Sequence, residues 1–399
     1  MSLCSLSNDK KTTFLFFILI TVILGVGYLF FCNPLYYSNL PETIDIGAVL
    51  PLTGDLSEYG HHVKDGIDLA VAEVNAAGGI HGRELHVWFY DNGGTIQGTL
   101  AGFQSARLRG LPVVIGAVSS SNTLAIAPLA EEYQMVLISP SSTVPSLSGY
   151  SDWVFRTIAS DTYKGRGMIR LVQDLGYNRT NFLVLYQDDD YGKGLYEIMM
   201  EAYHEEHPSE DLRSYTFLPG ESDFSHVNAI LHTDVDAVIL LGYTAESSRI
   251  IEQATQAGIT ISWFGDESIV NDEFINLTYP ASEGIMATLA SSHIISSSFE
   301  DTFITMYGHN PDTLSAYGYD TMKIVAEAVS IGGYNSPAIR DAIRKIRYLG
   351  ITGAKSFDKN GDVPPLFDVV RIHNGSWESV SRNELATSFQ KEKATTHAM

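Results

Sequence analysis

The sequence contains only two cysteines in 399 residues, Cys4 and Cys32, and both flank an apolar N-terminal run. The remaining chain therefore offers no disulfide framework and no thiolate nucleophile. It also lacks a G-x-S-x-G elbow and a phosphate-binding P-loop, and its 12 histidines lack the spacing of zinc ligands. The sequence accordingly predicts no catalytic residue, no metal site and no cofactor, and it disfavours an enzyme.

Basic residues are also scarce. The chain has 25 lysines and arginines against 47 aspartates and glutamates, which gives a formal net charge of −22. A protein that binds nucleic acid needs a basic surface to neutralise phosphates, so this balance argues against DNA or RNA as a partner. The composition is otherwise that of a globular protein, with 45% hydrophobic residues.

One long apolar run, Thr12–Phe31, contains no charged residue. It has the length of a membrane-spanning helix, and Lys10 and Lys11 on its N-terminal side predict that everything after Asn33 lies outside the cytoplasm. A cleaved signal peptide and a lipid-modified N-terminus are the alternatives. Both fit less well, because two phenylalanines stand directly before Cys32, where small residues are expected.

From residue 44 onward the sequence alternates between short apolar runs and amphipathic stretches. Ile44–Leu50 is typical of a buried parallel strand, and residues 60–77 have helical spacing that ends at Gly78. Similar strand–helix units continue on both sides of residue 160, which predicts two doubly wound, Rossmann-like α/β lobes with a ligand cleft between them. Three helical stretches and one strand follow, at 299–307, 313–331, 337–348 and 366–373.

Two hydroxyl-rich loops give the strongest functional signal. Gly116–Thr123 follows one predicted strand, and Ser139–Thr143 follows the next. In a parallel sheet both loops emerge at the same carboxyl edge, which is where ligands bind. Hydroxyl groups and free backbone N–H groups at a helix start suit a carboxylate, because the helix dipole favours negative charge there. The loops therefore predict a polar site for a small anionic group.

Further candidates also follow predicted strands. Glu267 stands at a strand end, where its carboxylate can pair with an ammonium group, and the preceding Asp266 is expected to cap the next turn. Tyr59, Tyr191 and Tyr243 occur just past strands and are suited to wall a ligand site. Each of these residues also has an ordinary structural interpretation, as a loop acid or a packed aromatic ring.

An ordered series of short motifs then points to a family. It comprises Gly47–Gly54, Tyr59-Gly60, Asn75–Arg83, Gly116–Ser120, Asp190–Gly194, Tyr319-Asp320 and Phe357–Asp362. In this order the motifs resemble those of the leucine/isoleucine/valine-binding proteins, which are type I periplasmic binding proteins of ABC importers. The resemblance covers residues 43 to 380, which is most of the chain.

The resemblance implies a site for an amino acid. Ser120 and Thr143 match the family's serine and threonine that hold the ligand's carboxylate. The backbone carbonyl of Ser141 and the carboxylate of Glu267 match the groups that take its ammonium group. The expected side-chain walls of the pocket are Tyr59, Tyr191, Tyr243 and Leu314.

The family topology also implies how the chain is divided. Residues 1–43 would form the anchor and a spacer, 44–161 and 290–362 the first lobe, 162–289 and 363–381 the second, and 382–399 a disordered tail. Three crossovers would join the lobes and let them close as a hinge around the ligand. The expected partners are the permease and ATPase subunits of an importer. A monomer anchored in the cell membrane, with its binding domain outside, is expected.

Alternatives remain for the ligand and for the partner. Relatives with the same fold bind amides or urea, so such a compound is the main competing ligand. The same closing module can also serve as a sensor for a separate signalling chain. Three Asn-x-Ser/Thr sequons, at Asn178, Asn276 and Asn374, are candidate glycosylation sites.

Overall fold

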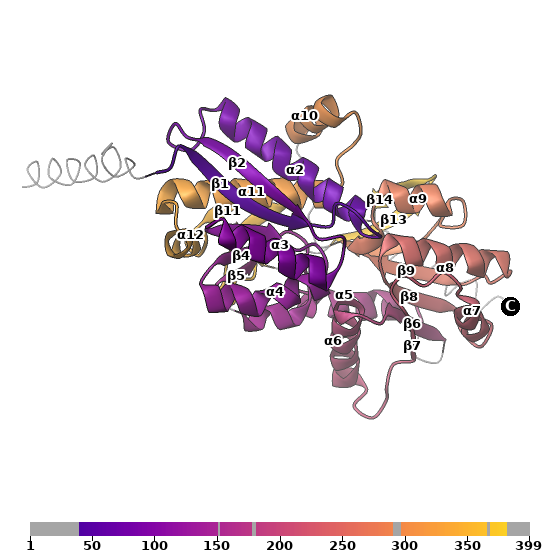
Figure 1. Cartoon of the computed structure of the whole chain (residues 1–399). Helices are drawn as coiled ribbons and strands as arrows, with labels where there is room; N and C mark the ends of the chain where they lie inside the picture. The colour runs from indigo at the N-terminus through magenta and orange to yellow at the C-terminus, as the bar shows by residue number, and fades with distance from the viewer. Residues whose placement is uncertain (1–39, 151, 178–180, 290–296, 365–367, 381–399) are drawn as a thin grey trace, which may run out of the picture.

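The computed structural model of the chain describes residues 40–150, 152–177, 181–289, 297–364 and 368–380. These residues form two α/β lobes that lie side by side (Figure 1). No helix within these ranges is both long enough and apolar enough to cross a membrane. The anchor expected at Thr12–Phe31, the tail at 382–399 and the sequon at Asn178 lie outside the described residues.

The first lobe is built on a five-stranded sheet in the order β2-β1-β3-β4-β5. Its strands are β1 (Thr43–Leu50), β2 (Glu84–Asp91), β3 (Val113–Gly116), β4 (Val136–Ser139) and β5 (Val154–Arg156). All neighbouring strands run parallel. Every residue of β3 and β4 is buried, as expected for strands that helices cover on both faces.

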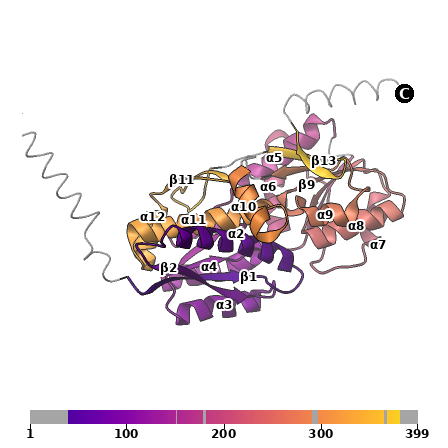
Figure 2. The same cartoon turned by 90° about the horizontal axis from the view of Figure 1, so that it is seen from above.

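Among the described residues, six helices cover this sheet. They are α2 (Ser57–Ala76), α3 (Ile96–Leu108), α4 (Ser120–Tyr133), α10 (Ser297–Tyr307), α11 (Thr313–Gly332) and α12 (Ser336–Ile343). Val49 of β1 packs with α3 and α4, whereas Ile44 and Ile46 pack with α2, α11 and α12 on the opposite face. The late helices α10 and α11 thus lie beside the early helix α2 (Figure 2).

The crossing of α2 and α11 brings two backbones into direct contact. A Cβ atom at Gly66 would lie 1.9 Å from the carbonyl oxygen of Ser315, and one at Gly318 would lie 2.3 Å from that of Val63. Any side chain at either position would collide with backbone, so the two glycines permit the crossing. This contact joins the N-terminal and C-terminal contributions to the first lobe.

The second lobe has a seven-stranded sheet in the order β14-β13-β10-β9-β8-β6-β7. Its strands are β6 (Phe182–Gln187), β7 (Ser214–Phe217), β8 (Ala237–Leu241), β9 (Ser262–Asp266), β10 (Met286–Leu289), β13 (Asp368–His373) and β14 (Ser376–Ser379). β6 to β10 pair in parallel, whereas β13 pairs antiparallel with β10 and with β14. A late strand therefore extends a sheet formed mainly by the middle of the chain.

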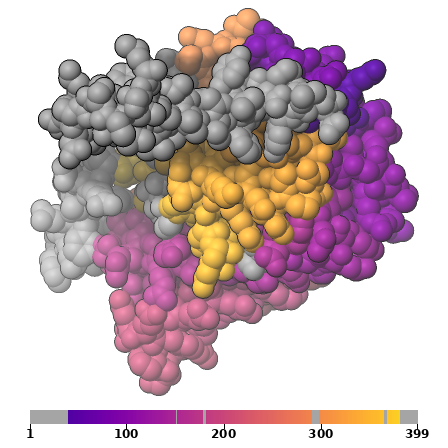
Figure 3. Space-filling view, turned by 90° about the vertical axis from the view of Figure 1, so that its left-hand side faces the viewer, coloured from indigo at the N-terminus to yellow at the C-terminus, as the bar shows by residue number. Residues whose placement is uncertain are grey.

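The helices of the second lobe are α5 (Asp161–Asp174), α6 (Asp190–Glu206), α7 (Ser225–Leu231), α8 (Thr244–Gln256) and α9 (Asp272–Thr278). α5 and α6 share one core with Phe182 and Val184, while α7, α8 and α9 share another with Leu183 and Leu185. Figure 3 shows the late segments of the chain, coloured orange to yellow, against the early segments, coloured indigo and purple. The exact lobe boundaries and the three crossovers stay predictions.

Several short elements were absent from the sequence-based prediction. The helix expected at 337–348 ends at Ile343, and Arg347–Gly350 instead forms β11, which pairs with β12 (Gly353–Ser356) in a separate hairpin. The strands β5, β10 and β14 and the helix α9 were also missed. Each has at most seven residues, which is too short for a periodic pattern to stand out.

Candidate functional site

A cavity lies between the two lobes, at the carboxyl ends of their central strands. Its empty volume is about 580 Å³, a value that includes space open to solvent. All eight residues predicted for the binding site line this one cavity: Tyr59, Ser120, Ser141, Thr143, Tyr191, Tyr243, Glu267 and Leu314. The structure thus brings the predicted set together, while its role in ligand binding stays a prediction.

The first hydroxyl-rich loop connects β3 to α4. Ser119 caps the helix and accepts a hydrogen bond from the backbone N–H of Asn122 at 3.4 Å. Ser120, the first residue of α4, is 2% exposed and lines the cavity. The hydroxyl of Tyr243, which belongs to the second lobe, faces the backbone of Ser120. The positive end of α4 therefore points at the cavity, as the sequence predicts.

The second hydroxyl-rich loop follows β4 and is tied to the first. The hydroxyl of Ser141 donates to the carbonyl oxygen of Val118 at 2.9 Å, and Ser142 is hydrogen-bonded to Thr123. The hydroxyl of Thr143 donates to Oδ2 of Asp161 at 2.7 Å. Most of the predicted hydroxyl donors thus bind protein groups, a use that the sequence alone did not indicate.

An acidic cluster with one lysine forms the next part of the site. Glu267 begins the 3-10 turn η3 (Glu267–Ile269), and Asp266 caps it by accepting from the N–H of Ser268 at 3.0 Å, which confirms the expected cap. Lys164 of α5 contacts three carboxylates. Its Nζ lies 2.7 Å from Asp161 Oδ1, 2.7 Å from Glu267 Oε1 and 3.4 Å from Asp266 Oδ2.

Burial and charge act in opposite directions in this cluster. Burial raises the pKa of the Glu267 carboxyl to about 7, although the charge of Lys164 acts to lower it. Burial also tends to lower the pKa of Lys164, but the charges of Asp161, Glu267 and Asp266 hold it above its ordinary value. Lys164 is therefore a buried, permanently charged ammonium group beside the cavity.

Lys164 was missed because a helical lysine is usually exposed. The signal was present in the spacing, since Lys164, Met168 and Leu171 recur at intervals of four and three residues on the buried face of α5. A lysine on such a face needs buried carboxylate partners. Asp161, one turn earlier, supplies the first of them.

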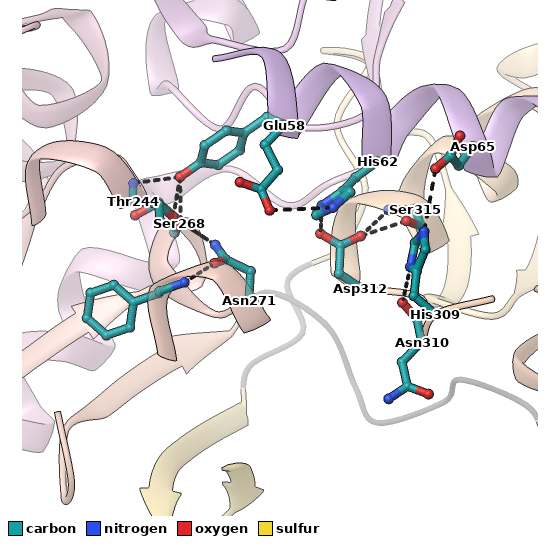
Figure 4. A network of polar contacts seen from close by, with 12 residues as sticks. Glu58, His62, Asp65, Thr244, Ser268, Asn271, His309, Asn310, Asp312 and Ser315 are labelled. Atoms are coloured by element: carbon teal, nitrogen blue, oxygen red, sulfur yellow. Dashed lines mark hydrogen bonds and ion pairs between the residues drawn. The ribbon is translucent and has the colours of Figure 1, made fainter. Parts of the chain in front are cut away.

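The tyrosines close the cavity at the junction of the lobes. The ring centroid of Tyr243 lies 5.6 Å from that of Tyr59 and 5.5 Å from that of Tyr191. The hydroxyl of Tyr59 lies 2.8 Å from the carbonyl oxygen of Ser268, and it accepts from the backbone N–H of Thr244 at 2.7 Å. These contacts join the first lobe to the second beside the site (Figure 4).

A second polar group lies at the edge of the same cavity. Asp312, which lines it, holds Nδ1 of His62 at 2.6 Å, and Glu58 lies on the other side of that imidazole (Figure 4). Burial tends to lower the pKa of His62, but Asp312, Glu58 and Asp65 raise it overall to about 9. Burial and a hydrogen bond with Glu273 of the second lobe raise the pKa of Glu58 to about 8.

Two of the three sequons belong to described residues. Asn276 lies in α9 and Asn374 in the turn between β13 and β14, and both are exposed. The exposure meets the physical requirement for a glycan at these positions. Glycosylation itself stays a prediction.

The chain has clear similarity to known proteins. A family profile described as periplasmic binding protein matches residues 43–376. The leucine-, isoleucine-, valine-, threonine-, and alanine-binding protein of Pseudomonas aeruginosa is 26% identical over 335 residues, which cover 82% of this chain and 89% of that protein.

Solved structures resemble the fold as well. The leucine binding protein LivK from Thermotoga maritima matches with a TM-score of 0.78 and 26% identity, over 85% of this chain and 98% of that one. The branched-chain amino acid transporter substrate binding protein LivJ from Streptococcus pneumoniae, solved in complex with isoleucine, matches with a TM-score of 0.76 and 28% identity. That match covers 85% of this chain and 99% of the LivJ chain.

Proposed function

This chain belongs to the periplasmic binding protein family, in its leucine/isoleucine/valine-binding branch, and we propose that it is the extracellular substrate-binding component of an ABC importer for a small aliphatic amino acid. The observation that carries this proposal is the convergence of eight residues from both lobes on one cavity. The cavity offers N–H donors at one side and a carboxylate at another. A zwitterion needs this pair of features.

The carboxylate and ammonium groups of the ligand would bind the polar residues of the cavity. The backbone N–H groups at the start of α4, with the Ser120 hydroxyl, would hold the ligand's carboxylate. The ammonium group would bind Glu267 and the carbonyl oxygen of Ser141. The Thr143 hydroxyl donates its hydrogen bond to Asp161, so its oxygen would accept from the ligand's ammonium group. The backbone N–H of Thr143 would donate to the ligand's carboxylate.

The remaining walls favour an aliphatic side chain. Val118, Ile158, Val270 and Leu314 line the cavity together with the tyrosine rings. The polar neighbour Asp312 already pairs with His62 and accepts from Ser315. It therefore has little capacity left for a polar ligand side chain. These walls support leucine, isoleucine, valine or alanine over a charged amino acid.

Closure would complete the site. Tyr59 of the first lobe contacts Thr244 and Ser268 of the second, and Ser120 and Tyr243, from opposite lobes, line the same cavity. These contacts describe a closed arrangement, which the ligand would stabilise through the groups that it touches on both lobes. The permease and ATPase subunits would receive the amino acid from this state. We further propose that residues 12–31 anchor a monomeric receptor with its lobes outside the membrane.

The experiment is thermal unfolding of the purified full chain in detergent, against each of the twenty amino acids, urea and short amides. A ligand that binds only the folded state stabilises it by about 2.7 kcal/mol at a hundredfold excess over Kd. We expect the midpoint to rise with leucine, isoleucine, valine or alanine. No shift with any amino acid would contradict the proposal.

An uncharged amide or urea is the second candidate ligand. The observation that favours it is Lys164, which already supplies a cation to Glu267. A carboxylate that is paired in this way can accept from a neutral N–H group without needing a ligand cation. Midpoint shifts with amides or urea alone would support this candidate and would keep the role in import.

A further inference from the structure

Three carboxylates and one ammonium group are buried together beneath the ligand cavity. Asp161 and Asp266 are 0% exposed, Lys164 is 3% exposed and Glu267 is 11% exposed. Lys164 reaches the group from α5, whereas Glu267 and Asp266 belong to the end of β9 and the turn that follows it. The cluster therefore links the first helix of the second lobe to the edge of its sheet.

The two oxygens of Glu267 are in different environments. Oε1 lies 2.7 Å from Nζ of Lys164. Oε2 is buried and has no hydrogen-bond partner in the part of the chain that the structure describes. A buried carboxylate oxygen without a partner is costly, so a donor from outside the protein is expected to satisfy it. Glu267 lines the cavity, so that donor can come from a ligand.

We propose that Lys164 is a positioning residue for ligand binding: its ammonium group fixes Oε1 of Glu267 and leaves Oε2 for the ammonium group of the ligand. The inference rests on the proposed function and deepens it, because it names the residue that keeps the ammonium subsite in its binding form. Lys164 does not line the cavity, so it acts through Glu267 rather than by direct contact.

Lys164 has this effect because of the charge balance of the cluster. Three carboxylates in one buried site repel one another, and without a cation at least one of them takes up a proton. With Lys164 present, the four groups carry a net charge of −2 when all are ionised, which still attracts a ligand cation. A protonated Glu267 would lose most of that attraction.

The pH dependence of binding follows from the groups that face Glu267. These are Lys164 and Asp161 from α5, Asp266 from β9, Tyr191 from α6 and Tyr317 from α11. Tyr191 and Tyr317 stay neutral, because burial raises the pKa of each hydroxyl. Burial raises the pKa of Glu267 to about 7, so a bound ammonium group would expel a proton near that pH. Affinity should therefore increase as the pH rises through about 7.

The test is calorimetric titration of the full chain with L-leucine between about pH 6 and about pH 9, in buffers with different ionisation enthalpies. For the native chain we expect a fractional proton release near pH 7 that disappears at the alkaline end. This measurement needs no variant. Absence of any proton release over the range would overturn the inference, even with leucine bound.

Substitutions then separate Lys164 from a general structural role. Lys164→Met should weaken leucine binding about tenfold near pH 7 and move the half-maximal pH upward, because Glu267 becomes harder to ionise. Lys164→Arg should retain the native pH profile. In a Glu267→Gln background, Lys164→Met should cause no further loss. An equal loss in both backgrounds, at every pH, would mean that Lys164 is only structural and would overturn the inference.

Two controls keep the outcomes distinct. Lys323→Met removes an ion-paired lysine of α11, bonded to Glu73 at 3.2 Å, and should leave both affinity and pH profile unchanged. If Lys164→Met does not fold, the proton release of the native chain, which needs no variant, still tests the inference. Failure of the native chain to bind any amino acid would contradict the proposed function itself. If the native chain binds leucine and the Lys164 variants bind it with the same affinity and pH profile, only this inference is overturned.

Discussion

The hydroxyl of Tyr59 in α2 lies 2.8 Å from Oγ1 of Thr244 and 2.7 Å from the backbone nitrogen of the same residue in α8. It also lies 2.8 Å from the carbonyl oxygen of Ser268. One phenolic oxygen of the first lobe is thus surrounded by three polar groups of the second. Tyr59 lines the cavity, and a substitution that removes its hydroxyl also tests lobe closure.

Tyr59→Phe should weaken leucine binding about tenfold, since the buried N–H of Thr244 would lose its acceptor only in the closed state. The phenylalanine ring would still line the cavity, so its apolar contacts would persist. Calorimetric titration measures the change. Tyr334→Phe is the matched control, because its hydroxyl donates to the carbonyl of Asp45 within the first lobe at 2.6 Å. Equal losses from the two variants would contradict a closure role.

Leu314→Ala should alter selectivity among aliphatic amino acids. Leu314 and Val270 both line the cavity, so truncation of Leu314 removes apolar surface that we expect a long ligand side chain to contact. We expect the affinity for leucine to fall about tenfold and that for alanine to stay unchanged. Leu277→Ala, at a 52% exposed position in α9, is the control and should change neither. A uniform loss for leucine and alanine would argue against this orientation of the ligand.

Much of the candidate site follows from elementary topology. Ser120 and Thr143 come after neighbouring parallel strands, β3 and β4, so their loops must meet at one sheet edge. Glu267 and Tyr243 follow β9 and β8, which are also neighbours. Adjacent parallel strands therefore predict that each pair meets at one sheet edge, whereas the resemblance to the binding-protein family predicted that the two pairs face the same cleft.

The polar bonding inside the site could not be predicted in the same way. The Ser141 hydroxyl donates to the carbonyl oxygen of Val118, and the Thr143 hydroxyl donates to the carboxylate of Asp161. Both bonds depend on how separate segments of the chain pack together. Lys164 was missed for a related reason. Its burial is stabilised by carboxylates up to 103 positions away in sequence, and no local pattern carries that information.

Gly66→Ala should destabilise the first lobe strongly. The new Cβ atom would lie 1.9 Å from the carbonyl oxygen of Ser315, and neither backbone can move without separating α2 from α11. Overpacking of this kind costs about 2 kcal/mol or more. Urea unfolding measures the loss. Gly149→Ala, where the added Cβ meets nothing within 4 Å, should stay within about 0.5 kcal/mol of the native chain.

The carboxyl groups of Glu58 in α2 and Glu273 in α9 form a hydrogen bond between the lobes, which requires a proton. Burial, followed by this bond, raises the pKa of Glu58 to about 8 from an ordinary value of 4.5. A carboxyl with a raised pKa binds its proton more tightly in the folded protein. Its contribution to stability is therefore complete below pH 4.5 and is lost as the pH rises through about 8.

Glu58→Gln should remove this pH dependence, because the amide keeps an N–H donor for Glu273 but does not titrate. We expect the melting temperature of the variant, relative to the native chain, to be higher at pH 8 than at pH 5 by about 2 °C. In the native chain His62 is mostly charged at both pH values, because its pKa is raised to about 9. Glu300→Gln, on the exposed surface of α10, serves as the control. If the difference between Glu58→Gln and the native chain is the same at both pH values, the shared proton does not contribute to holding the lobes together.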